Sequence, residues 1–145
     1  MAKQSFPPNS PDDVEQSFYE AMQHGDIERL MACWASSDDI ACVHPGGPRL
    51  LGMAAVRHAF ETVLSNGPVR VRLAKVHKTQ YEHWAIHSVL EVVELVGNDG
   101  PQKAWVLATN VYARQPEGWR MVVHHASPGQ REEPMELHSV PTVLH

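Results

Sequence analysis

The spacing of apolar residues changes near residue 68 and divides the chain into two parts. Before that point, apolar side chains recur every three or four positions, as on one face of an amphipathic helix. After it, apolar and polar residues alternate, which indicates strands, and we expect these at about 69–80, 83–97, 102–114 and 119–127. Helices followed by a run of antiparallel strands predict an α+β fold.

Local signals place the ends of three helices in the first part. Ser10 can cap the first helix, Gly25 ends it, and Asp26 can cap the second. Gly52 leads into the third helix, and the Asn-Gly-Pro sequence at 66–68 terminates it. Each helix carries an apolar stripe, so all three are expected to pack against the sheet.

Turn residues interrupt the predicted strands at three places. A short apolar run at 40–44, IACVH, is stopped by Pro45 and two glycines. The sequences GNDG at 97–100 and QPEG at 115–118 predict hairpin turns between neighbouring strands. The helices and these hairpins belong together as one domain at 10–129.

The outward face of the strand at 102–114 is more apolar than a solvated sheet requires. Alternation places Trp105, Leu107, Thr109 and Val111 on that face. The segment HWAIHSVLEVVELV before it is apolar on both faces, which is typical of a strand buried on both sides. We therefore predict a homodimer through the outer sheet face.

Length and charge exclude several classes of protein. The chain has 145 residues, the size of one domain, with 43% hydrophobic residues and a net charge of -5. Without a block of basic residues it is not expected to bind nucleic acid. No run approaches the roughly 20 apolar residues that cross a membrane, and the first residues lack the apolar stretch of a signal peptide. We expect a cytoplasmic protein with a loosely docked arm at 1–9 and a tail at 130–145 whose role the pattern does not assign.

Histidine and cysteine contents raise the question of a metal. The chain has ten histidines and two cysteines, but neither HExxH nor a cysteine–histidine quartet with zinc spacing is present. The histidines are spread over helix, turn and both strand faces, so no three are expected to converge. We therefore expect no metal and no cofactor, and interpret Cys33 and Cys42 as small buried thiols.

Three motifs in this order are similar to a known family. They are HGDIERLMACWA, HPGGPRLLGMAAVRHAF and GWRMVVHHASPG, within residues 12–129. The chain resembles the nuclear-transport-factor-2-like superfamily, and within it the bacterial SnoaL-like branch. The resemblance implies a cystatin-like α+β barrel, in which a strongly curved, mixed, mainly antiparallel sheet forms a cone around three N-terminal helices.

The same resemblance marks positions that carry chemistry in the steroid-isomerase branch. There a carboxylate base ends the first strand before a proline, and His44 takes that place here. Phe18 stands where the isomerases have a tyrosine donor, and the adjacent Tyr19 should point about 100° away along the helix. Asn110 replaces a second, acidic donor. Because of these replacements we do not expect steroid isomerisation, but polar groups remain in the same places.

His44 has two interpretations. As a pocket residue it could act as a base, an acid or a ligand-orienting donor; as a turn residue it would bond a nearby backbone carbonyl. Alternation and the resemblance place Asn110 inside, as a donor to an oxyanion. They favour His125 rather than His124 inside, although a bulge would reverse this assignment. The remaining expected pocket residues are Phe18, Trp34, Phe60 and Tyr112.

Two functions remain open from the sequence. The first is a conical pocket for a small, largely apolar molecule with a carbonyl or hydroxyl, with possible isomerase, dehydratase or cyclase chemistry by cofactor-free proton transfer. His44 would then be the base or acid, Asn110 the oxyanion donor and His125 an auxiliary donor. The alternative is a non-catalytic dimeric module for ligand binding or protein association. A cavity that reaches both His44 and Asn110 would favour the first; an interior filled by side chains would favour the second.

Overall fold

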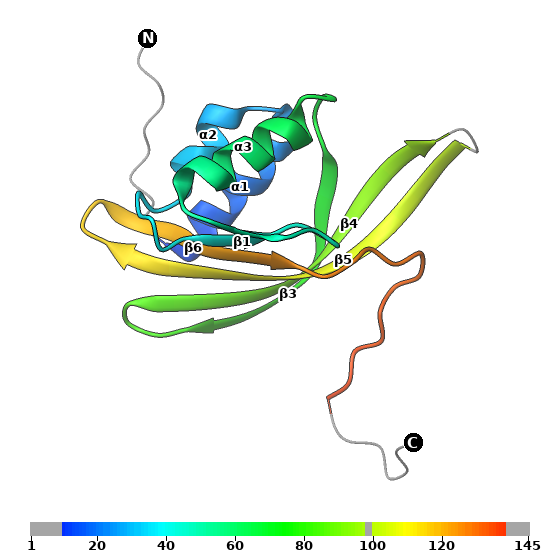
Figure 1. The fold of residues 1–145 in the computed structure, drawn as a ribbon. Coiled ribbons are helices and arrows are strands. Elements are labelled where there is room, and N and C mark those ends of the chain that lie inside the picture. The colour runs from blue at the N-terminus through cyan, green and yellow to red at the C-terminus, as the bar shows by residue number, and fades with distance from the viewer. Residues whose placement is uncertain (1–9, 98–99, 139–145) are drawn as a thin grey trace.

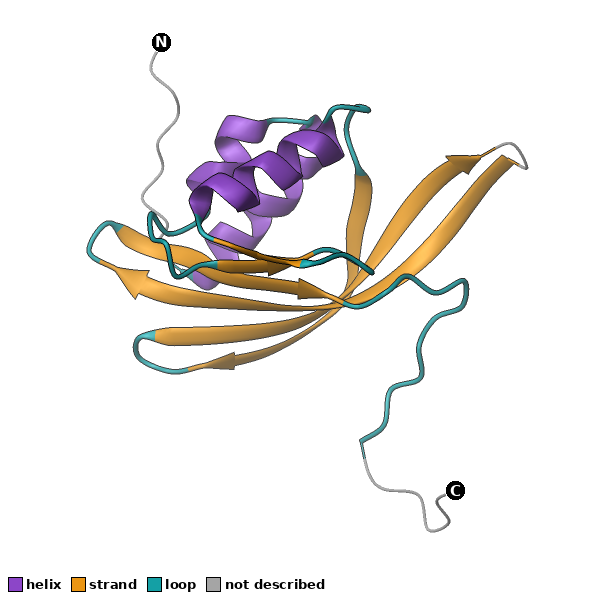
Figure 2. Ribbon diagram, viewed as in Figure 1, coloured by secondary structure: helices purple, strands orange, loops and turns teal. Residues whose placement is uncertain are grey.

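The structure is a computed structural model that describes residues 10–97 and 100–138. The predicted arm at 1–9 and the last residues of the tail, 139–145, lie outside the described residues. Three helices gather on one face of a six-stranded sheet, as predicted for an α+β fold (Figures 1 and 2). The helices are α1 (Pro11–His24), α2 (Ile27–Ala32) and α3 (Met53–Leu64). The strands are β1 (Ala41–Val43), β2 (Arg49–Leu51), β3 (Arg70–Gln80), β4 (Trp84–Gly97), β5 (Gly100–Gln115) and β6 (Gly118–Ala126).

The capping residues expected from the sequence hold the ends of the first two helices. The Ser10 side chain accepts a hydrogen bond from the backbone N–H of Asp13, and Asp26 does the same for Arg29. Gly25 adopts the left-handed conformation, with φ of 67°, and its N–H closes the last turn of α1. A side chain with a Cβ would be strained there, so this glycine allows α1 and α2 to meet at a sharp angle.

The strand order in the sheet is β2-β1-β6-β5-β4-β3. Neighbours are antiparallel except for β1 and β6, which run parallel. The β4–β5 hairpin is long, and its far end projects beyond the helices (Figure 1). The four long strands match the alternation pattern, whereas β2 was missed because its three residues lie between Pro48 and Gly52. The QPEG turn joins β5 to β6 as predicted, and residues 98 and 99 of the GNDG turn lie outside the described residues.

A β-bulge in β6 changes which side chains face the helices. Asn110 pairs with His124 and Tyr112 with Met121, so Val122 is the extra residue on the bulged strand. Met121 and His124 therefore both face inwards although they are three positions apart. This single insertion decides the orientation of the histidine pair near the end of β6.

The hydrophobic core lies between the helices and the covered face of the sheet. Phe18 of α1 is fully buried there and packs edge-on against Tyr19, Trp34 and Phe60. No helix among residues 10–97 and 100–138 has the length and apolar character needed to cross a membrane.

Within residues 10–97 and 100–138, no helix lies on the opposite face of the sheet (Figure 2). After β6 the chain continues beside β5, where Trp105 and Gln130 exchange two backbone hydrogen bonds. The described part of the tail then passes to the side of the sheet away from the helices (Figure 1). A groove of about 880 Å³ lies between this face and the segment 134–138.

Candidate functional site

His44 lies directly after β1 and begins the Pro-Gly-Gly turn. The turn is closed by the backbone, since the carbonyl of His44 accepts a hydrogen bond from the N–H of Gly47 at 2.8 Å. The centre of its ring instead lies 4.7 Å from the ring centre of Phe60. The buried Nε2 of His44 has no hydrogen-bond partner among the described residues. Burial lowers the pKa of His44, so the imidazole is neutral near pH 7. The hydrogen-bonding capacity of this buried nitrogen is therefore unused among the described residues.

Trp34 provides a second unpaired nitrogen, on another ring that contacts Phe60. The residue follows α2 and is almost fully buried, and its ring lies 6.3 Å from that of Phe60. Its indole Nε1 is buried without a hydrogen-bond partner in the part of the chain that the structure describes. Indole nitrogen is a donor only, whereas a neutral imidazole can donate or accept. We call Trp34 and His44 the nitrogen pair.

Four other buried side chains form a continuous series of hydrogen bonds, which we call the buried polar chain: His124, Asn110, Tyr19 and Glu91. His124 Nδ1 lies 2.5 Å from Asn110 Oδ1, and Asn110 Nδ2 donates to the Tyr19 hydroxyl at 3.0 Å. Tyr19 in turn donates to Glu91 Oε2 at 2.6 Å. The chain thus links β6, β5, α1 and β4 through the middle of the core.

Burial sets the charge states along this chain. It lowers the pKa of His124 to about 3, with smaller contributions from His44 and His125, so His124 is neutral at physiological pH. It raises the pKa of Glu91 to about 7, against a smaller opposing contribution from the Tyr19 hydrogen bond. It also raises the pKa of Tyr19 well above its ordinary value. The neutral His124 therefore donates from Nδ1 to the Asn110 carbonyl, and the donors run in one direction towards Glu91.

Two predictions about side-chain direction were wrong. His125 is exposed and His124 is buried, because the bulge at Val122 shifts the alternation by one residue. Tyr19 does not point away from the site but reaches Asn110, because α1 is buried over more of its circumference than a single stripe. Asn110 does face inwards as predicted, and it is fully buried.

Most of the expected pocket residues lie together, and Tyr112 lies apart from them. Phe18, Trp34, His44 and Phe60 lie around each other and around the ring of His124. Tyr112 lies apart from them against His87, with a ring-centre distance of 4.9 Å. Asn110 meets the cluster only through His124, since both ends of its amide are already bonded within the polar chain.

Sequence reasoning missed Glu91 and His87, which are both buried on β4. A usable signal was present, because both residues have the same parity as Ala85 and Val89, which face the core. The continuous apolar character of this strand obscured that parity. Glu15 of α1, the hydrogen-bond partner of His87, also falls outside the predicted apolar stripe.

The sequence matches the model of the SnoaL-like domain over residues 12–130. No similarity to a curated protein sequence was found. The described architecture agrees with this match, since solved structures with an NTF2-like or cystatin-like fold align with the chain at TM-scores of 0.67 to 0.72.

Two solved structures share about a third of their sequence with this chain. A protein from Thiobacillus denitrificans, provisionally named as a calcium/calmodulin-dependent protein kinase type II association domain, is 36% identical, with a TM-score of 0.77 over 87% of this chain and 100% of that one. A protein from Streptomyces avermitilis, provisionally named as a dehydratase of the NTF2-like family, is 33% identical, with a TM-score of 0.72 over 79% of this chain and 90% of that one. An NTF2-like protein of unknown function from Pseudomonas putida is 20% identical, with a TM-score of 0.71 over 88% of this chain and 93% of that one, and shows the fold alone.

Proposed function

Because the chain belongs to the SnoaL-like family, whose fold hosts many unrelated chemistries, we propose its function from the core residues themselves. The protein binds a small, largely apolar molecule with a carbonyl or hydroxyl group beside Phe60. The observation that carries this proposal is the nitrogen pair, since two buried nitrogens, on two rings that both contact Phe60, have no partner among the described residues. Such groups cost stability unless a partner is supplied, and a bound molecule would supply it.

The chemistry of the pair defines what it would recognise. Trp34 Nε1 can only donate a hydrogen bond, and the neutral His44 can accept a proton. A ligand oxygen at Trp34 and an acidic C–H or O–H at His44 fit this arrangement. The rings of Phe18 and Phe60 favour an apolar body for the ligand.

Proton transfer at His44 would support isomerisation, dehydration or aldol-type cyclisation without a cofactor. The 33% identity to the Streptomyces protein provisionally named as a dehydratase supports this range of reactions. Asn110 has a different role in this proposal from the oxyanion donor first expected, because its amide is occupied by His124 and Tyr19. It holds His124 in place behind His44, whereas the exposed His125 has no part in the site.

A ligand screen with one matched variant tests the proposal. Carbonyl and hydroxyl compounds would be screened by thermal shift, and the best hit measured by calorimetry with the parent and with His44→Ala. Loss of a hydrogen bond to bound ligand should weaken affinity about tenfold or more, and binding by the parent should decline as the pH falls and His44 is protonated. His58→Ala, on the exposed side of α3, is the control and should bind as the parent does. Unchanged affinity in His44→Ala would refute the proposal.

A second function, self-association, is favoured by the uncovered face of the sheet. Trp84, Ile86 and Leu107 are 54%, 39% and 42% exposed there, and Met135 of the tail beside them is 83% exposed. The 36% identity to a protein provisionally named as an association domain supports this candidate. We propose a homodimer through this face, which the two-sided apolar pattern of β4 also indicates.

Light scattering tests the dimer directly. The parent should have twice the monomer mass of 16.2 kDa, and Leu107→Glu should reduce the mass to that of the monomer. Lys103→Gln, on the same strand but nearer the hairpin end, changes the net charge by the same one unit and is the charge-matched control. A monomeric parent at micromolar concentration would contradict this second candidate.

A further inference from the structure

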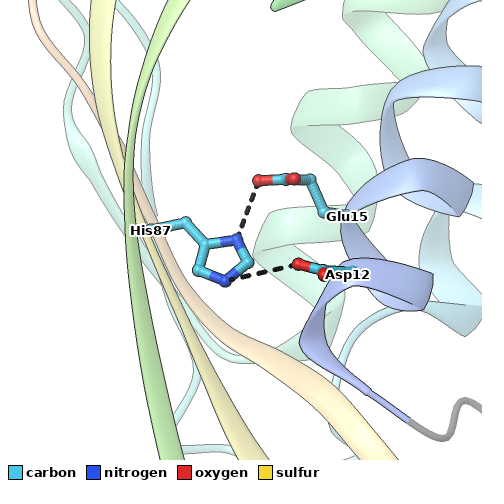
Figure 3. A group of neighbouring side chains, drawn as sticks. All are labelled: Asp12, Glu15 and His87. Atoms are coloured by element: carbon cyan, nitrogen blue, oxygen red, sulfur yellow. Dashed lines mark hydrogen bonds and ion pairs between the residues drawn. The ribbon is translucent and has the colours of Figure 1, made fainter. Parts of the chain in front are cut away.

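A second polar cluster lies where the first turn of α1 meets β4, away from the nitrogen pair (Figure 3). His87 is 1% exposed, and its Nδ1 lies 2.8 Å from Glu15 Oε2. The other ring nitrogen, Nε2, points towards Asp12 and lies 3.9 Å from its Oδ1 (Figure 3). One ligand atom from each of the three residues lies within 4.8 Å of the other two.

The hydrogen bond to Glu15 determines what faces Asp12. In the neutral tautomer whose Nδ1–H donates to Glu15, Nε2 carries a lone pair. This nitrogen makes no hydrogen bond to any residue that the structure describes. Its separation from Asp12 is too long for a hydrogen bond, even if Nε2 carried the proton. Two electron-pair donors thus face each other, an arrangement that a cation between them stabilises.

We propose that His87 and Asp12 bind a divalent transition-metal ion, with zinc the best fit, and that Glu15 holds the imidazole in the orientation for binding. Zinc bonds to histidine nitrogen and carboxylate oxygen are about 2.0–2.2 Å long, and tetrahedral geometry places two such ligand atoms about 3.4 Å apart. The observed 3.9 Å is about 0.5 Å longer than this separation, and a small rotation of the exposed Asp12 side chain would close the difference. A carboxylate on the second ring nitrogen is the usual way in which proteins orient a metal-binding histidine.

Charge and access agree with this assignment. Asp12 and Glu15 together carry two negative charges, which balance one divalent ion when the histidine is neutral. Asp12 is 60% exposed, and a groove of about 440 Å³ along α1 reaches Asp12, Glu15 and Lys78. An ion can therefore enter from solvent, and water can complete its coordination. Tyr112 closes the other side, with its ring against that of His87.

Lys78 is the competitor for this site. Its ammonium group lies 2.8 Å from Asp12 Oδ1, so a metal ion must displace it. Removing the lysine charge should therefore tighten metal binding. This gives the proposal a signature that a purely structural contact between α1 and β4 would not produce.

The site goes beyond the function proposed for the nitrogen pair and does not depend on it. The proposal also differs from the expectation that no metal is needed. That expectation was based on the positions of the histidines and cysteines, and it did not include a site made of one histidine and two carboxylates on a helix. A bound ion would join the start of α1 to the middle of β4.

Calorimetric titration of the full, untagged chain with zinc, after treatment with a chelator, tests the proposal. The parent should bind one equivalent, and its melting temperature should rise with zinc. Asp12→Asn and His87→Gln should each weaken binding at least tenfold, whereas Lys78→Met should tighten it. Cobalt in place of zinc should give visible absorption bands in the parent that are lost in the same two variants.

The control is His83→Gln, an exposed histidine four positions before His87, which should bind zinc as the parent does. Asp12→Asn changes an exposed side chain, so it decides the result if His87→Gln fails to fold. The proposal is overturned if the parent binds no zinc. It is equally overturned if Asp12→Asn binds zinc as tightly as the parent.

Discussion

The buried polar chain and the nitrogen pair lie side by side in one core. They differ in whether their polar groups have hydrogen-bond partners. In the chain, each of its four side chains has a partner, from His124 through Asn110 and Tyr19 to Glu91. In the pair, the buried nitrogens of Trp34 and His44 have none among the described residues. A closed series stabilises the fold that contains it, whereas unpaired buried groups cost stability and are explained by a molecule that they bind.

The largest loss of stability should come from removing the hydrogen bonds at the centre of the buried polar chain. Asn110→Leu keeps the approximate volume but leaves the His124 Nδ1–H without its acceptor and removes the hydrogen bond that the Tyr19 hydroxyl accepts, so that Tyr19 keeps only its bond to Glu91. We expect a loss of about 4 kcal/mol in the free energy of unfolding, since each unsatisfied buried group costs about 1–3 kcal/mol. Urea unfolding measures it. Thr109→Val, the exposed neighbour on β5, should change stability little, and a loss below about 1 kcal/mol in Asn110→Leu would mean that the chain is not closed.

The next effect depends on pH and tests the end of the chain. The pKa of Glu91 is about 7 in the folded protein and 4.5 ordinarily, so the folded state holds this proton more tightly. The stability contributed by the protonated group is full below about pH 4.5 and is lost as the pH rises through 7. Glu91→Gln does not titrate, so its stability relative to the parent should improve by up to about 3 kcal/mol between pH 4.5 and 8.

The parent must be compared with Glu91→Gln because the titration of His124 changes the stability with pH in the opposite direction. Its pKa is lowered to about 3, so its contribution is present near neutrality and is lost as the pH falls from about 6.5 towards 3. The parent alone therefore shows the sum of two opposed trends. Urea unfolding of both proteins at pH 5 and pH 8 separates them, and a difference that does not change with pH would show that Glu91 is an ordinary carboxylate.

A smaller effect is expected when the nitrogen pair receives the same kind of polar-to-apolar change. His44→Phe removes a buried nitrogen that has no partner, so no neighbouring group loses a hydrogen bond. We expect the free energy of unfolding to change by less than about 1 kcal/mol, far less than for Asn110→Leu. A loss as large as that of Asn110→Leu would show that the ring stabilises the fold, and the contrast between the two groups would fail.

The smallest effect tests the bulge that separates the two histidines. His125 is exposed, so His125→Ala should change stability by less than about 0.5 kcal/mol. His124→Ala should cost several times more, because it opens the polar chain and leaves a cavity. Thermal or urea unfolding of the two variants, which differ by one position, gives the answer. Equal losses would mean that the alternation in β6 continues without a bulge.

The sequence by itself was sufficient for the architecture and for part of the site. Capping residues such as Ser10 and Gly25 act on their own helix, and alternation acts within one strand, so both are readable from short stretches. Alternation also placed Asn110 on one face with Val106 and Ala108, and the family resemblance indicated that this face is the inner one. The place of His44 after the first strand followed from a local pattern as well.

Only the tertiary structure decided which of these groups are paired. The bulge at Val122 has no clear sequence signal, yet it exchanges His124 for His125 in the core. The contacts of Tyr19 with Glu91 and of Glu15 with His87 each join residues 72 positions apart. Such pairs form because α1 packs across β4, and the depth of that packing also determines burial and therefore the pKa of Glu91 and His124. Local patterns specify which way a side chain points on its own helix or strand. Its hydrogen-bond partners and its charge state depend on the residues that other elements place around it.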